Sequence, residues 1–336
     1  MPTVVPDMKV DVDMTNPPPE EDMKALVLED MAPEEPVEAT FSAAYDLDVP
    51  HAEGGVYDPV THAFFVGSLV TGGVHRIDAN SGEERQVYAE QRPGEWWTLG
   101  LGIDVERRWI WVCSMSDLRE VGEGDPANLG YIVQFDLETE AAIRTYDLSQ
   151  AFPGANCADV EPAADGKVYV ADRAHPNIYV IDPETEQIEL FATDEALGGD
   201  VVGQNGLLVL PDQSGLLAIV YLTPKLVHVS LTDGSVKEVE IDGDFFDFVP
   251  PLSGADGITW DGGSALVMFS SKLNKITPMS ADWSSASSES IDTEPGMTDV
   301  IHTPGGNYIL NGQPVTFALE NEPEPTRLVR FDEVFD

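Results

Sequence analysis

The stretch Asp256-Gly257-Ile258-Thr259-Trp260-Asp261 decides the fold, because a phrase of the same shape returns along the chain. In each copy a small or polar residue precedes a few apolar positions and a turn. The other copies begin at Glu53, Leu99, Ala158, Asn205 and Thr298. A period of about 40–50 residues, with several strands in each unit, is the signature of a β-propeller. We therefore predict an all-β fold, a six-bladed β-propeller.

Strand-like segments separated by turn residues fill each unit. The first unit predicts strands at 53–57, 62–67, 73–78 and 85–89, and the third predicts strands at 159–161, 167–171, 177–181 and 187–192. The runs Asp78-Ala79-Asn80-Ser81-Gly82 and Thr232-Asp233-Gly234 between strands are hairpin signals. Each unit thus predicts one four-stranded blade. The outer strand of the fifth blade is expected within 282–292, where the pattern is least regular.

The N-terminal region divides into a leader and a closing strand. Residues 1–37 are predicted to be an acidic leader or tether, because a run such as Pro17-Pro18-Pro19-Glu20 fits neither a helix interior nor a central strand. Residues 38–336 then form the propeller. Residues 39–47 alternate like a strand, and the sixth unit shows only three clear strands. We predict that 39–47 closes the sixth blade as its outer strand, which removes a free edge.

Charge limits the partners of this chain. Its 336 residues include 17 basic and 61 acidic side chains, for a net charge of −44. Such a surface repels nucleic acid and anionic membranes, and no apolar run reaches the roughly 18 residues of a membrane helix. We expect a monomer that acts on a small molecule, with no nucleic-acid partner and no membrane insertion. Met1-Pro2 is followed at once by the acidic, proline-rich leader, which is the pattern expected after removal of a signal sequence. We therefore predict a secreted or periplasmic protein.

The two cysteines, Cys113 and Cys157, are expected in the second and third blades. Neighbouring blades could bring them close enough for a disulfide. Two buried free thiols are the favoured interpretation.

Three polar residues stand where an ordinary propeller has small or apolar ones, as at Leu99 and Ala158. Glu53, Asn205 and Asp256 share one register of the repeat, so their side chains should converge in the central channel. Two carboxylates that face each other cost free energy unless a cation or a proton lies between them. Oxygen ligands of this kind suit Ca²⁺, whereas a softer metal would favour His or Cys. The sequence therefore predicts a divalent cation, Ca²⁺ first, in the channel.

These motifs resemble those of a known family. Glu53-Gly54-Gly55-Val56-Tyr57 is similar to its E-G-P-x-W opening, and Asn205-Gly206-Leu207 with Pro211-Asp212 is similar to its N-G-L-x-x-x-P-D motif. Asp256-Gly257 is similar to its D-G motif. The family is the senescence marker protein/gluconolactonase group, which includes regucalcin and is related to diisopropyl fluorophosphatase. The resemblance implies a six-bladed propeller over residues 50–335 and a hydrolase of lactones or related esters that depends on a divalent cation, usually Ca²⁺.

The resemblance also implies residue roles. Glu53, Asn205 and Asp256 would hold the cation, and Asp256 would in addition act as general base or nucleophile. The family's other asparagine ligand falls at Ala158 in this chain. Asn156 lies two residues earlier, and a strand turns alternate side chains to the same face. Asn156 is therefore the replacement ligand that we expect.

The loops before the innermost strands supply candidate substrate contacts. Trp97, Phe246 and Phe248 are predicted to wall an apolar pocket, and His51, two residues before Glu53, is predicted to face the same channel. Packing of these aromatic rings between blades is the alternative.

The departure at Ala158 and the acidic leader favour a second function, a non-catalytic secreted binding module with a structural or absent cation. A third, metal-free function resembling strictosidine synthase would need a late channel glutamate that does not stand out here.

Overall fold

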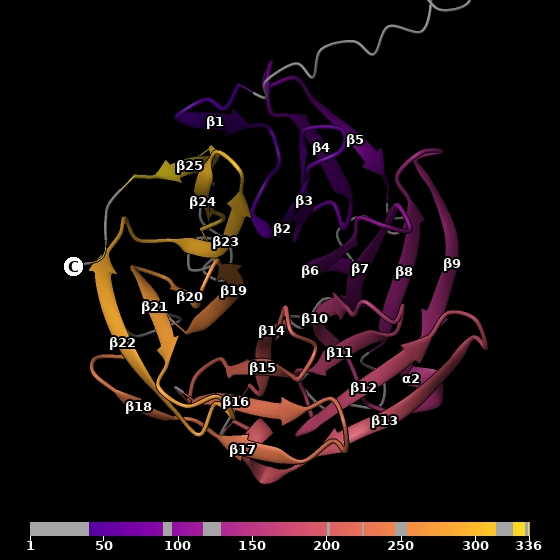
Figure 1. The fold of residues 1–336 in the computed structure, drawn as a ribbon. Helices are drawn as coiled ribbons and strands as arrows, with labels where there is room; N and C mark the ends of the chain where they lie inside the picture. Colours follow the sequence, from indigo (N-terminus) through magenta and orange to yellow (C-terminus); the bar gives the residue numbers. More distant parts are fainter. Residues whose placement is uncertain are drawn as a thin grey trace, which may run out of the picture. The chain divides into compact units, whose positions relative to one another are not determined.

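A computed structural model describes residues 40–89, 96–116, 129–199, 202–223, 225–245, 254–313, 325–332 and 335. The compact unit formed by Ala39–Asp336 contains six β-sheets arranged round one axis, as Figure 1 shows. The innermost strands of consecutive sheets lie side by side, and the sixth returns to the first, so the ring closes. The predicted six-bladed β-propeller is confirmed.

Blades one to four are antiparallel sheets of four strands. The first blade contains β2 (Ala52–Asp58), β3 (Ala63–Ser68), β4 (Val74–Asp78) and β5 (Glu84–Tyr88). The second contains β6 (Trp96–Asp104), β7 (Trp109–Ser116), β8 (Gly130–Asp136) and β9 (Ala141–Asp147). The third contains β10 (Cys157–Pro162), β11 (Val168–Asp172), β12 (Asn177–Asp182) and β13 (Gln187–Thr193). The fourth contains β14 (Gln204–Val209), β15 (Gly215–Val220), β16 (Lys225–Ser230) and β17 (Val236–Glu238).

The last two blades each include a strand from elsewhere in the chain. The fifth contains β19 (Ala255–Asp261), β20 (Ser264–Phe269), β21 (Lys272–Pro278) and β22 (Ser285–Asp292). The short β18 (Glu240–Asp242) joins it parallel to β22, an addition that the sequence analysis missed. The sixth contains β23 (Met297–Thr303), β24 (Gly306–Asn311) and β25 (Thr326–Phe331). β1 (Ala44–Leu47) pairs antiparallel with β25 and covers an edge that would otherwise be unpaired.

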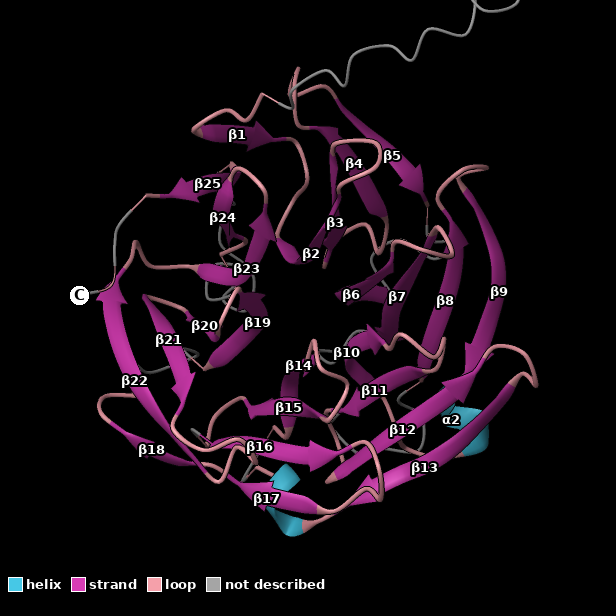
Figure 2. Cartoon of the chain, viewed as in Figure 1, coloured by secondary structure: helices cyan, strands magenta, loops and turns pink. Residues whose placement is uncertain are grey.

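Helical structure is minor in the described ranges. Only α2 (Leu148–Ala151) and the 3₁₀ turn η1 (Glu195–Leu197) occur there, both at the rim of the ring in Figure 2. Among those residues, no helix has the length and apolarity to cross a membrane.

Large apolar side chains fill the spaces between neighbouring blades and leave the polar groups to line the channel. Trp111 is fully buried between the second and third blades with Leu99 and Tyr179. Between the sixth and first blades, Tyr308 and Phe64 meet edge to face with ring centroids 5.0 Å apart. Alternate strand residues therefore pack on the adjacent blade, which holds the ring rigidly round its axis.

One prediction about this core is wrong. Cys113 on β7 and Cys157 on β10 form a disulfide, with their Cα atoms 5.7 Å apart, rather than two free thiols. The reason is geometric, because β10 packs against β7 across the interface between the second and third blades. That distance lies within the ordinary range for a disulfide.

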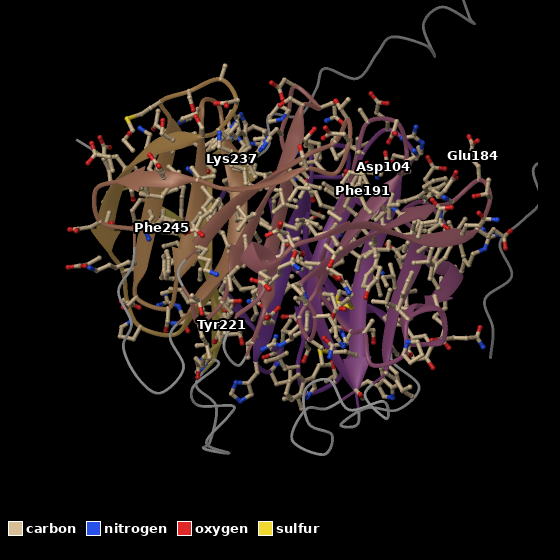
Figure 3. The ribbon with its side chains drawn as sticks, turned by 90° about the horizontal axis from the view of Figure 1, so that it is seen from below. Asp104, Glu184, Phe191, Tyr221, Lys237 and Phe245 are labelled. Atoms are coloured by element: carbon tan, nitrogen blue, oxygen red, sulfur yellow. A yellow bond between two sulfur atoms is a disulfide. The ribbon has the colours of Figure 1, made fainter. Side chains whose placement is uncertain are left out.

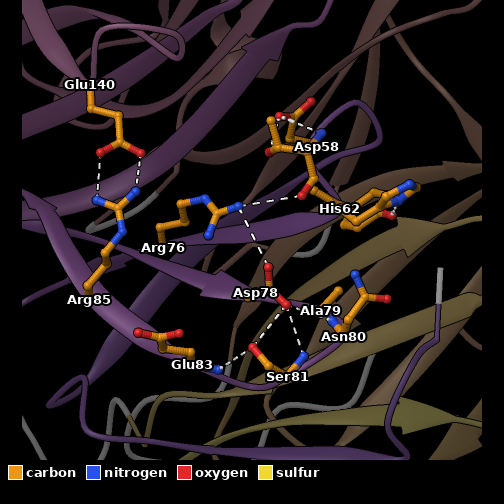
Figure 4. A network of polar contacts seen from close by, with 12 residues as sticks. Asp58, His62, Arg76, Asp78, Ala79, Asn80, Ser81, Glu83, Arg85 and Glu140 are labelled. Atoms are coloured by element: carbon orange, nitrogen blue, oxygen red, sulfur yellow. Dashed lines mark hydrogen bonds and ion pairs between the residues drawn. The ribbon is translucent and has the colours of Figure 1, made fainter. Parts of the chain in front are cut away.

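Polar contacts of the first blade fix turns and link it to the second blade (Figure 4). Asp78 accepts the backbone N–H of Ser81 at 2.9 Å, which closes the hairpin turn predicted there. Arg85 of the first blade pairs with Glu140 of the second. Asp58 is buried, and its carboxylate accepts hydrogen bonds from both terminal nitrogens of Arg108, at 2.7 and 2.8 Å. Burial works to raise the pKa of Asp58, but hydrogen bonds led by Arg108 outweigh it and lower that pKa.

Candidate functional site

A β-bulge at the channel end of every inner strand shapes the candidate site. Pairing between the first and second strands of each blade shifts register between residues 52 and 55, 98 and 101, 157 and 160, 204 and 207, 255 and 258, and 297 and 299. A bulge leaves a residue out of the ladder and redirects its side chain. Glu53, Asn205 and Asp256 each lie inside such a bulge. The repeat register that singled them out in the sequence is thus a structural feature of the strands.

Glu53, Asn205 and Asp256 line one small cavity at the start of the inner strands, here called the mouth pocket. Its volume of about 20 Å³ has room for about one water molecule or one ion. The other residues that line it are Gly54, Gly100, Ala158, Asp159, Gly257, Thr298 and Asp299. The structure therefore brings together three of the four predicted cation ligands.

The polar side chains of the mouth pocket contact one another. The amide nitrogen of Asn205 donates to Oδ1 of Asp256. Nη1 of Arg173 donates to Oδ1 of Asn205 at 3.3 Å, and the Arg173 guanidinium lies 5.7 Å from the ring centre of Tyr221. Figure 3 shows Tyr221 towards one face of the ring, with Lys237 and Asp104 towards the other. Arg173 and Tyr221 thus mark the face at which the mouth pocket opens.

Both carboxyl groups of the mouth pocket are harder to ionise than usual. Burial, followed by the nearby Asp256 carboxylate, raises the pKa of Glu53 well above its ordinary value. Burial and then Asp299 likewise raise the pKa of Asp256. The positive charge of Arg173 opposes the rise in both pKa values. Without a further cation, the pocket therefore favours a proton on at least one of these carboxyl groups.

A second pair of carboxylates lies one residue further along the channel, here called the middle layer. Asp159 accepts the backbone N–H of its neighbour Val160 and that of Leu207 in the fourth blade, both at 2.8 Å. Asp299 accepts the N–H of Val300 at 2.7 Å and that of Gly55 in the first blade at 2.8 Å. Each aspartate therefore ties its own blade to the next one.

Two glycines make room for the middle layer. A Cβ atom at Gly100 would lie 1.9 Å from Oδ1 of Asp159, and one at Gly257 would lie 1.8 Å from Oδ1 of Asp299. Burial raises the pKa of Asp159 to about 7, although hydrogen bonds from Leu207 and Val160 act to lower it. Burial also raises the pKa of Asp299 well above its ordinary value.

Beyond the middle layer the channel widens into a cavity of about 170 Å³. Asp159 and Asp299 lie at its border, and Glu161 also lines it. Burial and the charge of Asp159 raise the pKa of Glu161. The channel is thus acidic over its described length.

The other predicted site residues lie apart from the mouth pocket. Asn156 directly precedes β10, is 0 % exposed, and its side-chain amide has no hydrogen-bond partner among the described residues. His51 is 5 % exposed, and its Nδ1 lies 3.2 Å from the carbonyl oxygen of Gly312. Trp97 is 8 % exposed and packs in the core between the second and third blades. Phe246 and Phe248 lie outside the described residues.

Sequence reasoning missed Arg173 and Tyr221. Each directly follows the second strand of its blade, and each donates its N–H to the residue just before the inner strand, at Asn156 and at Gly203. The repeat could have pointed to both residues, because the position after the second strand of each blade borders the same channel mouth as Glu53. An arginine there is conspicuous in a chain with 17 basic residues.

The donor chemistry at the mouth fits a hard divalent cation. Within the described part of the chain, no group of three or more His, Cys, Asp or Glu side chains is arranged to hold a metal ion. The mouth pocket instead offers two carboxylates and one amide, which are all oxygen ligands of the kind that Ca²⁺ accepts. Burial and neighbouring carboxylates raise the pKa of Glu53 and that of Asp256, which is the direction expected where two carboxyl groups lack a neutralising charge.

No protein-family model and no curated protein matches the chain. Solved structures do match it. The major allergen Mala s 1 of Malassezia sympodialis is 17 % identical with a TM-score of 0.71, over 88 % of this chain and 98 % of that one. A gluconolactonase from Xanthomonas campestris is 17 % identical with a TM-score of 0.56, over 87 % and 91 %. A luciferin-regenerating enzyme is 11 % identical with a TM-score of 0.59, over 87 % and 96 %. At these identities the chain shares a propeller fold with all three proteins.

Proposed function

We propose that this propeller is a lactonase-type hydrolase that holds a divalent cation, Ca²⁺ first, in the mouth pocket. One observation carries the proposal: Glu53, Asn205 and Asp256 come from three different blades and line a single cavity of about 20 Å³. The fold shared with the Xanthomonas campestris gluconolactonase lends support. The proposed substrates are lactones or related esters.

In this proposal the three residues divide the work. Glu53, Asn205 and Asp256 would supply oxygen ligands to the cation, which when bound would polarise the carbonyl oxygen of the substrate. Asp256 would also accept a proton from water as general base, while the amide of Asn205 fixes the orientation of its carboxylate. Asn156 would join as a ligand only after a shift of the backbone before β10.

Phe246 and Phe248, which lie outside the described residues, remain the proposed substrate wall. Trp97 and His51 are less suited to touch substrate, because both side chains are buried outside the mouth pocket.

A second candidate function is a binding module without catalysis. The observation that favours it is the hydrogen bond from Arg173 to Asn205, because it places a positive charge of the chain itself beside the proposed cation position. In that case the propeller would bind a small polar ligand at its mouth, and the cation would be structural or absent.

We also propose a secreted or periplasmic location and a monomeric state. The disulfide between Cys113 and Cys157 supports the location, because disulfides persist mainly in oxidising compartments.

The test is thermal unfolding, first with EDTA and then with Ca²⁺, Mg²⁺, Mn²⁺ or Zn²⁺. A cation that binds only the folded protein raises the midpoint as its concentration rises. We expect this shift with Ca²⁺, its loss in Glu53→Gln, and its retention in the control Glu184→Gln, whose side chain is exposed far from the mouth. Hydrolysis of lactones, esters and phosphotriesters is then screened with the same proteins. A midpoint that no cation moves, in a protein purified without bound metal, would leave the binding module as the function.

A further inference from the structure

The backbone at Arg173 is held firmly at the channel mouth. Its N–H donates to the carbonyl oxygen of Asn156 at 3.3 Å, and its own carbonyl oxygen accepts the N–H of Gly203 at 2.8 Å. The preceding residue, Asp172, is fully buried and contacts Nδ1 of His175 at 3.0 Å and the hydroxyl of Tyr179 at 2.9 Å. The third and fourth blades together thus fix the point from which the Arg173 side chain extends.

The guanidinium of Arg173 contacts the fourth blade. Nη1 donates to Oδ1 of Asn205 at 3.3 Å, and the group lies 5.7 Å from the ring centre of Tyr221. Tyr221 is buried, so its ring offers a firm surface for a cation–π contact. The oxygen that Arg173 contacts is the same oxygen that Asn205 would offer to a divalent cation.

The charge of Arg173 already acts on the proposed ligands. Burial and the mutual repulsion of the two carboxyl groups raise the pKa of Glu53, and Arg173 works against this rise. The same positive charge works to lower the pKa of Asp256. The contact of its guanidinium with Asn205 places one positive charge of the chain itself beside the acidic mouth before any ion binds.

We infer that Arg173 is the built-in counter-cation of the mouth pocket and that it competes with the divalent cation for Oδ1 of Asn205. This inference rests on the proposed cation site and adds how the affinity of that site is set. An ion at Asn205 would lie within a few ångströms of the guanidinium, and like charges at that distance repel strongly in a partly buried site. Arg173 is half-buried, so part of its side chain already faces solvent.

Calcium titration of the unchanged protein and three variants tests this inference. Arg173→Met removes the charge and keeps the length of the side chain. Arg144→Met is the matched control, since Arg144 is also an arginine next to a tyrosine ring, 5.9 Å from the centre of Tyr146, but at the rim. We expect Arg173→Met to bind Ca²⁺ about 10- to 100-fold more tightly than the unchanged protein, by the size of effect that a like charge has at close range. Arg144→Met should bind as the unchanged protein does.

The readouts are the dissociation constant from calorimetry and the thermal midpoint at fixed Ca²⁺. If the unchanged protein binds Ca²⁺ and Arg173→Met binds it equally or more weakly, the competition is refuted while the proposed function stands. If neither protein binds any divalent cation, the proposed function and the competition both fail. If only Arg173→Met binds, Arg173 fully replaces the ion in the unchanged protein, which supports the competition and contradicts the cation-dependent function. Arg173→Lys, which keeps the charge, should remain close to the unchanged protein and guards against a folding defect in Arg173→Met.

Discussion

The mouth pocket and the middle layer both contain buried carboxyl groups, one residue apart along the inner strands. The two layers differ in the donors that these carboxyl groups contact. Asp159 and Asp299 in the middle layer each accept two backbone N–H groups, one of them from the next blade. At the mouth, Asp256 is contacted by the side-chain amide of Asn205, and Arg173 contacts that same amide. Backbone donors cannot move away, whereas side-chain donors can. The middle acids therefore fasten blades together, and the mouth acids can exchange their partners for a ligand.

The middle layer also repeats across the ring. Asp159 ties the third blade to the fourth, and Asp299 ties the sixth to the first. Gly100 and Gly257 stand beside these aspartates at matching positions of the second and fifth blades. The fastening carboxylates thus lie on opposite sides of the axis, while Glu53, Asn205 and Asp256 break this symmetry at the mouth. That asymmetry is what a site for one ligand requires.

The largest expected effect separates the two layers by stability. Asp299→Ala removes the acceptor of two partly buried N–H groups, on Gly55 and Val300, and should lower the free energy of unfolding by about 2–4 kcal/mol. Asp256→Ala should leave that free energy unchanged or higher in EDTA, because it removes a buried carboxyl group from an acidic channel, and should abolish hydrolysis and the Ca²⁺ shift. Urea unfolding in EDTA measures both variants. Equal losses of stability would mean that the two layers do not differ.

A smaller effect concerns pH. The pKa of Asp159 rises from 3.8 to about 7 on folding, so the folded protein binds more protons than the unfolded chain between these values. Its contribution to stability is therefore greatest at low pH and declines as pH rises towards 7. Asp159→Asn should flatten this decline in EDTA, as measured by unfolding midpoints from pH 4 to pH 8.

Asp58 provides the control of opposite sign. Its pKa is lowered in the folded protein, so its contribution is present above its unfolded pKa and is lost as pH falls through the folded value. Asp58→Asn should therefore reduce stability at neutral pH and have less effect in acid.

If Asp159→Asn leaves the dependence of the unfolding midpoint on pH unchanged, Asp159 is charged from pH 4 to pH 8 in the folded protein.

The smallest effect concerns the predicted aromatic wall. Trp97 packs between blades, so Trp97→Phe should lower the free energy of unfolding by about 1–2 kcal/mol and leave the KM for a hydrolysed substrate unchanged. Steady-state kinetics on the best substrate of the screen measures this. A raised KM would instead place this ring against the substrate.

The sequence revealed the parts of the molecule that follow the repeat. The six units predicted the ring, and the shared register predicted that Glu53, Asn205 and Asp256 would converge, because equivalent positions of a closed ring meet at its axis. Asn156 was expected beside them from strict alternation, but the register of β10 shifts between Cys157 and Val160, and a bulge breaks alternation. A pattern of polar and apolar residues does not reveal where a strand carries its extra residue.

Contacts between separate units were beyond the sequence. The disulfide needed the distance between β7 and β10, and the place of Arg173 needed the direction of a long side chain that leaves the end of β11. The parallel addition of β18 to the fifth blade likewise depends on the path of a connection rather than on its composition. Each of these features arises where two repeats meet.

The pairing of β1 with β25 also determines which parts of the propeller can fold first during synthesis. Ala44 meets Val329, so the sixth sheet joins residues from the two ends of the propeller sequence, whereas every other sheet is built from residues near one another in the chain. During synthesis, the first five blades can assemble as they emerge from the ribosome, and β1 must wait for β25. We therefore expect ring closure to be the last pairing to form, since contacts between residues far apart in the chain slow folding.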